Sequence, residues 1–220
     1  MNRAFIPFFA ALFMSASQVQ ANNQSLIQIV VDHSGVMLDE RDLMERRSFR
    51  TFVQEYLTEF ARRHRRDRDS TTIRIISASE RPYVIWSGTA AELYRDGLQN
   101  QAFQAVFTDA PSGCNDLVTA LEEALVGAEI FGQGAATVLH VISSGVHSGP
   151  NCDGLTQDGY DAIVENADPA LISAIAETAP QFDVFTLQFM SAAQRRDILA
   201  GLRDEGVRVQ MFAQGEEPRF

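Results

Sequence analysis

Polar side chains that could bind a ligand follow an apolar run near the start of the chain. Asp32, His33 and Ser34 come directly after the nearly unbroken apolar run 26–31, and a glycine follows them. This pattern is typical of a strand that is buried on both faces and ends in a polar tip at the edge of a sheet. The tip is therefore the first candidate for a functional site.

A second strand of similar design lies further along the chain. Apolar residues dominate 137–142, and Ser143, Ser144 and a glycine follow, with His147 and Ser148 close behind. In open α/β folds, ligands bind at the carboxyl-terminal edge of the sheet. The two polar tips together indicate a binding face at that edge.

The same side chains contain the groups of a catalytic triad. A hydrolase would use Asp32, His147 and Ser148. No serine lies in a Gly-x-Ser-x-Gly turn, which is the usual setting of a nucleophile in α/β hydrolases. His33 adjoins Asp32 on an extended segment and should therefore point the other way. The sequence favours a protein that is not an enzyme, with the hydrolase as the weaker alternative.

The first residues have the pattern of a secretory signal. One cation, Arg3, precedes an apolar core at 4–14, and small residues lead to Ala21. The apolar core is shorter than the ~20 residues of a spanning helix, so a membrane anchor is the weaker reading. We expect a signal peptide at 1–21 and a periplasmic or secreted product without a membrane span.

Composition limits the possible partners. The formal net charge is −11, which disfavours nucleic acid and anionic membranes because both repel an acidic protein. Cys114 and Cys152 are the two cysteines of a chain expected in an oxidising compartment. A single disulfide is the leading interpretation and two free thiols are the alternative. The cysteines and the four scattered histidines lack the spacing of a zinc site.

Hydrophobic periodicity predicts alternating strands and helices. The short turn between two of the strands requires an antiparallel pair. The predicted fold is an α/β, Rossmann-like, open and mostly parallel sheet with one antiparallel edge hairpin and helices on both faces. The expected strands are 25–31, 71–77, 82–86, 137–143, 182–188 and 207–212; the expected helices centre on 49–60, 116–132, 168–178 and 191–204, with weak helix at 89–107 and a long connection at 146–168.

These residues resemble a known family. Asp-His-Ser-Gly-Val-Met at 32–37 is similar to the first metal-binding loop of von Willebrand factor type A domains, usually Asp-x-Ser-Gly-Ser-Met. The hairpin, the Gly-Cys-Asn-Asp-Leu turn at 113–117 and the strand ending in Ser-Ser-Gly follow in the family's order. The resemblance covers roughly 24–212, so we expect a domain at 22–212 that leaves a polar tail at 213–220. It implies a non-catalytic module that binds a protein partner through loops at the carboxyl-terminal edge.

In that family the edge holds a metal ion bound by an Asp and two Ser, a Thr and a further Asp. Asp32 and Ser34 match, and Val36 replaces the second serine. The threonine position falls on Asn115, or on Cys114 if it is counted one residue earlier, and Ser144 replaces the last aspartate. Mg²⁺ needs about six oxygen ligands. The resemblance therefore implies a degenerate site at Asp32, Ser34 and Asn115, with at most a weakly bound Mg²⁺ or Mn²⁺.

The resemblance also places both cysteines at this edge, where a disulfide would tie 146–168 to the loop beside the metal position. Asp109, Asp116 or Asp153 could replace a missing ligand. The alternative function is an envelope structural or assembly protein without a ligand site, in which Asp32 only caps a turn. The residues expected on the ligand face are His33, Asp109, Asp116, Ser144, His147 and Asp153.

Overall fold

The structure is a computed structural model that describes residues 24–34, 43–66, 70–99, 104, 113–132, 134–152 and 156–213. Its strands are β1 (Ser25–Asp32), β2 (Thr71–Ala78), β3 (Tyr83–Thr89), β4 (Ala136–Ile142), β5 (Val184–Met190) and β6 (Gln210–Ala213). Its helices are α2 (Leu43–His64), α3 (Ala90–Arg95), α5 (Leu117–Phe131), α6 (Gln157–Glu165), α7 (Pro169–Thr178) and α8 (Ala192–Asp204), with 3₁₀ turns η3 (Gly97–Gln99) and η5 (Ala179–Gln181).

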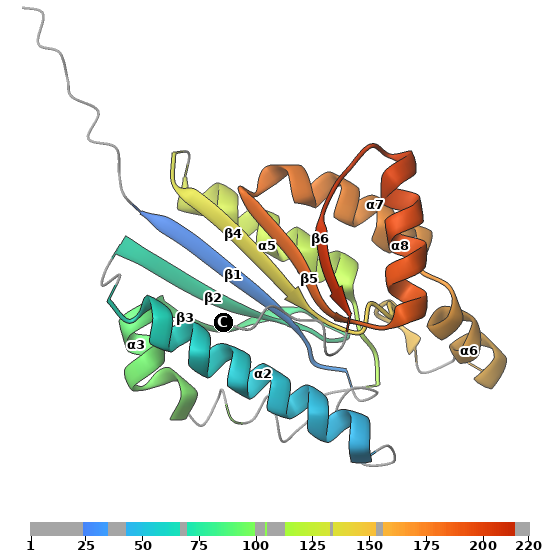
Figure 1. Cartoon of the computed structure of the whole chain (residues 1–220), viewed down its shortest axis with the longest axis horizontal. Coiled ribbons are helices and arrows are strands. Elements are labelled where there is room, and N and C mark those ends of the chain that lie inside the picture. Colours follow the sequence, from blue (N-terminus) through green and yellow to red (C-terminus); the bar gives the residue numbers. More distant parts are fainter. Residues whose placement is uncertain are drawn as a thin grey trace, which may run out of the picture.

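The strands form one six-stranded sheet in the order β3-β2-β1-β4-β5-β6 (Figure 1). β1 lies in the middle and pairs in parallel with both β2 and β4. β5 and β6 continue the parallel sheet, whereas β3 pairs antiparallel with β2 at the edge. The predicted open, mostly parallel sheet with one antiparallel edge hairpin is confirmed.

Two helical layers cover the sheet. In Figure 1, α2 and α3 lie below it, and α5, α7 and α8 lie above it. β1 contributes to both cores because its side chains alternate: Ile29 and Val31 pack with α2 and α3, and Val30 packs with α5 and α7. A strand buried on both faces explains the continuous apolar run in the sequence.

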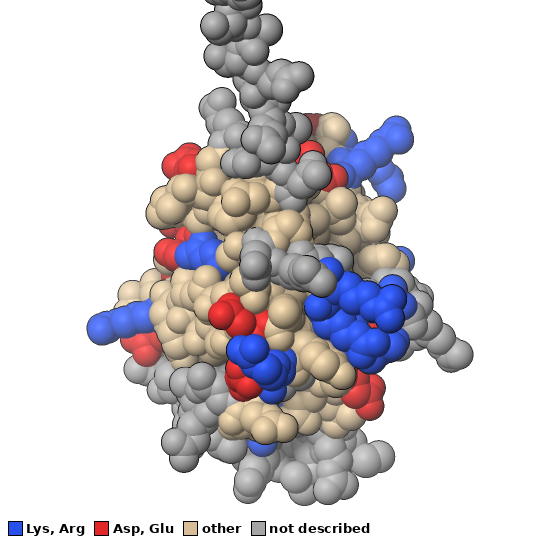
Figure 2. All heavy atoms as spheres, turned by 90° about the vertical axis from the view of Figure 1, so that its left-hand side faces the viewer, with Lys and Arg blue, Asp and Glu red and all other residues tan. Residues whose placement is uncertain are grey.

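The end of α2 carries exposed cations. Figure 2, viewed onto the left-hand side of Figure 1, shows a group of Arg side chains gathered on this face. Arg62 and Arg63 both form ion pairs with Glu59, one turn earlier in α2. These positive charges also suit the negative end of the helix dipole.

Part of the chain differs from the sequence-based expectation. The predicted long connection 146–168 contains α6, so it is not a continuous loop. Thr156 caps the start of this helix by accepting a hydrogen bond from the Gly159 amide. Its end is held by the Gln194 side chain, which donates to the carbonyls of Ile163, Val164 and Asn166. This tertiary cap lies far away in the sequence, which explains why the helix was not predicted.

Smaller differences concern element ends. β3 runs to Thr89 rather than ending at Trp86, and β6 is Gln210–Ala213 rather than 207–212.

None of the described helices is both long and apolar enough to cross a membrane. The predicted signal peptide at 1–21, most of the polar tail, and Val36, Asp109 and Asp153 lie outside the described residues.

Candidate functional site

The site is centred on Asp32, the last residue of β1. Its side chain points to the α5 side of the sheet and is 1 % exposed. Oδ2 accepts hydrogen bonds from Asn115 Nδ2 at 2.6 Å and from Ser143 Oγ at 2.8 Å. Oδ1 accepts one from the Ser34 backbone amide at 3.0 Å. Burial raises the pKa of Asp32 to about 6, although hydrogen bonds from Ser34 and Ser143 oppose the shift.

Asn115 joins three segments of this edge. Its Nδ2 also donates to the Val146 carbonyl at 3.0 Å, in the loop that follows β4. The Asn115 backbone amide donates to Ser148 Oγ, and its carbonyl accepts from the amides of Ser148 and Gly149. The residue is 3 % exposed, and its Oδ1 has no hydrogen-bond partner among the described residues. Asn115 therefore holds the end of β1 against the loop after β4.

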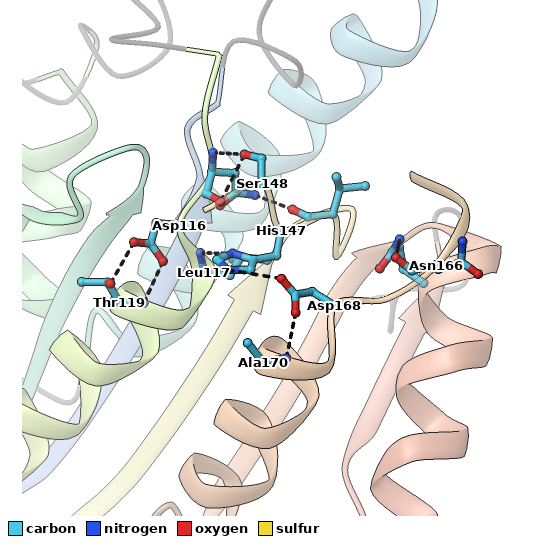
Figure 3. Close-up of polar contacts among 11 residues, drawn as sticks. Asp116, Leu117, Thr119, His147, Ser148, Asn166, Asp168 and Ala170 are labelled. Atoms are coloured by element: carbon cyan, nitrogen blue, oxygen red, sulfur yellow. Dashed lines mark hydrogen bonds and ion pairs between the residues drawn. The ribbon is translucent and has the colours of Figure 1, made fainter. Parts of the chain in front are cut away.

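The start of α5 fixes two more predicted residues (Figure 3). Asp116 is the N-cap: its carboxylate accepts from the Thr119 amide and hydroxyl. His147 Nδ1 accepts a hydrogen bond from the Leu117 amide at 3.2 Å. His147 Nε2 lies 3.9 Å from Asp168 Oδ2, and Asp168 caps α7 through the Ala170 amide. Both Asp116 and His147 thus satisfy helix amides that would otherwise lack partners.

The candidate triad is not assembled. Among the residues that the structure describes, no hydrogen bond joins His147 to Ser148 or to Asp32. His147 uses Nδ1 for the Leu117 amide, and Ser148 Oγ bonds the backbone of Asn115. A nucleophile and its base need a direct hydrogen bond of about 2.6–3.2 Å. This geometry gives no support to the hydrolase alternative.

Ser143 is a site residue that the sequence did not single out. The resemblance pointed to Ser144, but the Ser144 hydroxyl accepts from the Val146 amide at 3.4 Å, and its carbonyl accepts from Ser191. Ser143 instead bonds Asp32, and its Oγ also accepts from the Gly145 amide. Successive side chains at a strand end face opposite ways, so only one of two adjacent serines can reach Asp32.

A backbone irregularity at the end of β5 supports this turn. Phe189 has φ 66°, and the pairing of β5 with β6 shifts there. As a result, Phe189 packs against Phe49 of α2 while Met190 packs in the opposite core. Gly145 has φ +85°, and a Cβ at this position would overlap Met190 and crowd Gln194. A glycine is therefore required for the close approach of the turn to β5 and α8.

Cys114 and Cys152 form the disulfide that the sequence favoured. The bridge links the residue before Asn115 to the loop after β4, and the Cys152 amide also donates to Cys114 Sγ. Cys114 is 1 % exposed. The loops beside Asp32 are thus joined covalently as well as by hydrogen bonds.

Of the four predicted ligand-face residues that the structure describes, three are buried and Ser144 is half-buried. His33 lies against β2, with Nδ1 3.1 Å from Ser77 Oγ and its backbone amide bonded to Ala78. His33, Asp116 and His147 all have exposed fractions below one tenth. These side chains shape the edge from within and present little surface to a partner.

The arrangement does not match the ligand set of a divalent cation. Asp32 Oδ2 faces the NH₂ group of Asn115, which donates to it, whereas a cation needs oxygen atoms turned towards it. Within the described residues, no group of three or more His, Cys, Asp or Glu could hold a metal ion. Asp32, Ser34 and Asn115 do meet at one point, but as a hydrogen-bonded cluster.

Comparisons with known proteins show a similarity of fold alone. No protein-family model and no curated protein matches the chain. The pilus adhesin SpaC from Lactobacillus rhamnosus GG superimposes with a TM-score of 0.57 and 13% identity, over 88% of this chain and 28% of that one. Manganese-loaded TRAP from Plasmodium vivax gives a TM-score of 0.53 and 14% identity, over 90% and 66%. This chain thus spans less than two thirds of either.

A von Willebrand factor type A protein from Catenulispora acidiphila also matches, with 15% identity over 81% of this chain and 37% of that one, although its TM-score is only 0.46. The order of the sheet, the antiparallel edge strand and the two helical layers agree with the fold expected from the motif at 32–37. The chain has the fold of a von Willebrand factor type A-like domain.

Proposed function

We propose that this protein is a non-catalytic interaction module that works in the periplasm or outside the cell. It binds a protein partner through the loops at the carboxyl-terminal edge of the sheet. The observation that carries the proposal is the construction of that edge. Asp32, Asn115 and Ser143 form a buried hydrogen-bonded cluster under loops that a disulfide joins. A rigid scaffold that holds exposed loops is the usual basis of recognition by such folds.

The pilus adhesin among the structural neighbours supports an adhesive or interaction role, and the disulfide supports a site outside the cytoplasm. The surface available for contact consists of the exposed residues that lie above the buried cluster. Pro150 and Asn151 are exposed in the disulfide-bonded loop, and α6 follows them in the chain. A partner would touch these groups rather than Asp32 itself.

The test compares substitutions at opposite ends of the sheet. Asn151→Arg places a long charged side chain on the exposed loop beside the disulfide. Gln181→Arg makes the same change at an exposed position of η5, at the amino-terminal edge. Tagged wild type and both variants would capture partners from envelope extracts, and quantitative mass spectrometry would compare the captured proteins.

We expect Asn151→Arg to lose the partners that wild type and Gln181→Arg retain. Capture that survives Asn151→Arg but is lost with Gln181→Arg would place the contact at the other edge and overturn the proposal. Capture that neither substitution changes would favour the alternative, an envelope structural or assembly role without a ligand site at the carboxyl-terminal edge.

A further inference from the structure

Asn115 presents a hydrogen-bond donor to the Asp32 carboxylate. Its Nδ2 lies 2.6 Å from Asp32 Oδ2 and 3.0 Å from the Val146 carbonyl oxygen. Both neighbours are acceptors, so the orientation of the amide is determined: the reversed amide would place Oδ1 against two oxygens. The partial positive charge of the NH₂ group is therefore held between the end of β1 and the loop after β4.

We propose that the Asn115 side-chain amide takes the place that a divalent cation has in the family's metal site, so that this edge is organised without metal. A cation in such a site draws oxygen atoms of separate loops towards one point. Asn115 Nδ2 does the same for Asp32 and Val146, and the Ser143 hydroxyl adds a second donor to the same carboxylate oxygen.

Burial makes this arrangement difficult for a cation to displace. Asp32 is 1 % exposed and Asn115 is 3 % exposed. A metal ion bound to Asp32 Oδ2 would require the amide to turn and give up both of its hydrogen bonds. Lost hydrogen bonds between buried groups are costly, because water does not replace them. Asn115 Oδ1 has no partner among the described residues, so the two bonds from Nδ2 determine which way the amide faces.

A single substitution tests the exchange of amide for cation. Asn115→Asp replaces the donor with a carboxylate oxygen and leaves two carboxylates facing each other. With the Ser143 hydroxyl and the Val146 carbonyl, they offer the oxygen ligands that Mg²⁺ and Mn²⁺ prefer. Thermal unfolding of the wild type and the variant would be followed in EDTA, Mg²⁺ and Mn²⁺. We expect no metal response from the wild type and a rise in Tm of roughly 5–10 °C for Asn115→Asp at about one hundred times Kd.

Two controls separate this effect from added charge and from loss of the amide. Asn166→Asp adds the same charge at an exposed position at the end of α6 and should not respond to metal. Asn115→Ala removes the amide without adding a ligand, so it should be less stable in every buffer. A variant Asn115→Asp that folds and shows no metal response would overturn the proposal.

Calorimetric titration of the wild type decides the matter even if Asn115→Asp does not fold. The proposal predicts no heat of binding for Mg²⁺ or Mn²⁺ at Asp32. Sub-millimolar binding that Asp32→Ala abolishes would show that the cation displaces the amide, and the proposal would be wrong. Neither measurement uses a partner protein, so these results are independent of the proposed interaction function.

Discussion

Two polar clusters lie on the α5 side of β1, and they are built differently. Asp32 and Gln28 lie on the same side of β1, four residues apart. Gln28 donates to the Ala124 carbonyl of α5 and accepts from Arg74, and Arg74 also pairs with Glu123. Both polar atoms of the Gln28 amide are satisfied, and the arginine charge is balanced. Gly127 leaves the necessary space, because a Cβ there would overlap the Arg74 guanidinium.

The Asp32 cluster lacks such a balance. Among the described residues, neutral donors surround Asp32, no cation pairs with it, and Asn115 Oδ1 has no hydrogen-bond partner. A buried carboxylate without a cation destabilises the fold at neutral pH, as its raised pKa indicates. The Gln28 cluster therefore stabilises the fold. The Asp32 cluster lowers the stability at neutral pH, and a functional role would explain why the chain retains it. Polar groups that break the usual rules of burial tend to occur at functional sites.

The largest expected effect comes from the disulfide beside the Asp32 cluster. Its two cysteines are 38 residues apart in the sequence. Closing a loop of that length reduces the entropy of the unfolded chain, so the double variant Cys114→Ser, Cys152→Ser should lose about 4 kcal/mol in urea unfolding. Wild type with the disulfide reduced is the matched control and should lose a similar amount. A loss below about 1 kcal/mol would mean that hydrogen bonds alone hold this edge.

The second effect is a pH dependence due to Asp32. Burial raises its pKa in the folded state to about 6 from an ordinary value of 3.8. Between these values the folded state keeps a proton that the unfolded state has released. The contribution of Asp32 to the free energy of unfolding is therefore fully present below pH 3.8 and is lost as the pH rises through 6. At about 1.4 kcal/mol per pKa unit, Asp32→Asn should gain about 3 kcal/mol relative to wild type from pH 3 to pH 7.

The pH profile of wild type must be compared with that of Asp32→Asn, because His140 changes the stability with pH in the opposite direction. Burial, together with His64, lowers the pKa of His140 to about 4. The unfolded state then binds a proton that the folded state does not, and stability falls as the pH drops below 6.5. His140 is present in both proteins, so its contribution cancels in their difference. Asp158→Asn, at an exposed position of α6, controls for net charge. An equal pH profile for wild type and Asp32→Asn would contradict the assignment.

The third prediction breaks the balanced cluster. Arg74→Met removes the cation, leaves the Gln28 carbonyl oxygen unpaired and removes the ion pair between β2 and Glu123 of α5. We expect a loss of about 2 kcal/mol at neutral pH, measured by urea unfolding. Arg62→Met is the matched control: Arg62 pairs with Glu59 on the surface, with a side chain 55% exposed, and its loss should hardly change the midpoint. If both variants lose the same free energy of unfolding, the Gln28 cluster does not stabilise the contact between β1 and α5.

The smallest expected effect is that of the outer half of this ion pair. The Glu123 side chain is 35% exposed and accepts from Arg74 at 2.7 Å. Solvent screens the pair, so Glu123→Gln should cost at most about 1 kcal/mol, and the difference should shrink in high salt. A larger loss, unaffected by salt, would mean that Glu123 acts through packing rather than charge.

The Asp32 tip shows how far the sequence leads. The apolar run before it predicted a strand buried on both faces, and the polar residues after it predicted an edge position; both agree with the structure. The pairing of Cys114 with Cys152 was also favoured in advance. The choice of Ser143 over Ser144 could not be predicted, because it depends on the exact residue at which β4 ends and on which way each side chain then faces.

Local sequence therefore predicted the strands, the helices other than α6 and the class of fold, since hydrophobic periodicity and helix caps are properties of neighbouring residues. The order of the sheet and the edge at which the polar tips meet follow from connecting those elements in the usual way. Only the tertiary structure decided the chemistry of the site. Asn115 is 83 residues from Asp32, and whether its amide presents oxygen or nitrogen depends on Val146, a neighbour that only the folded chain brings there.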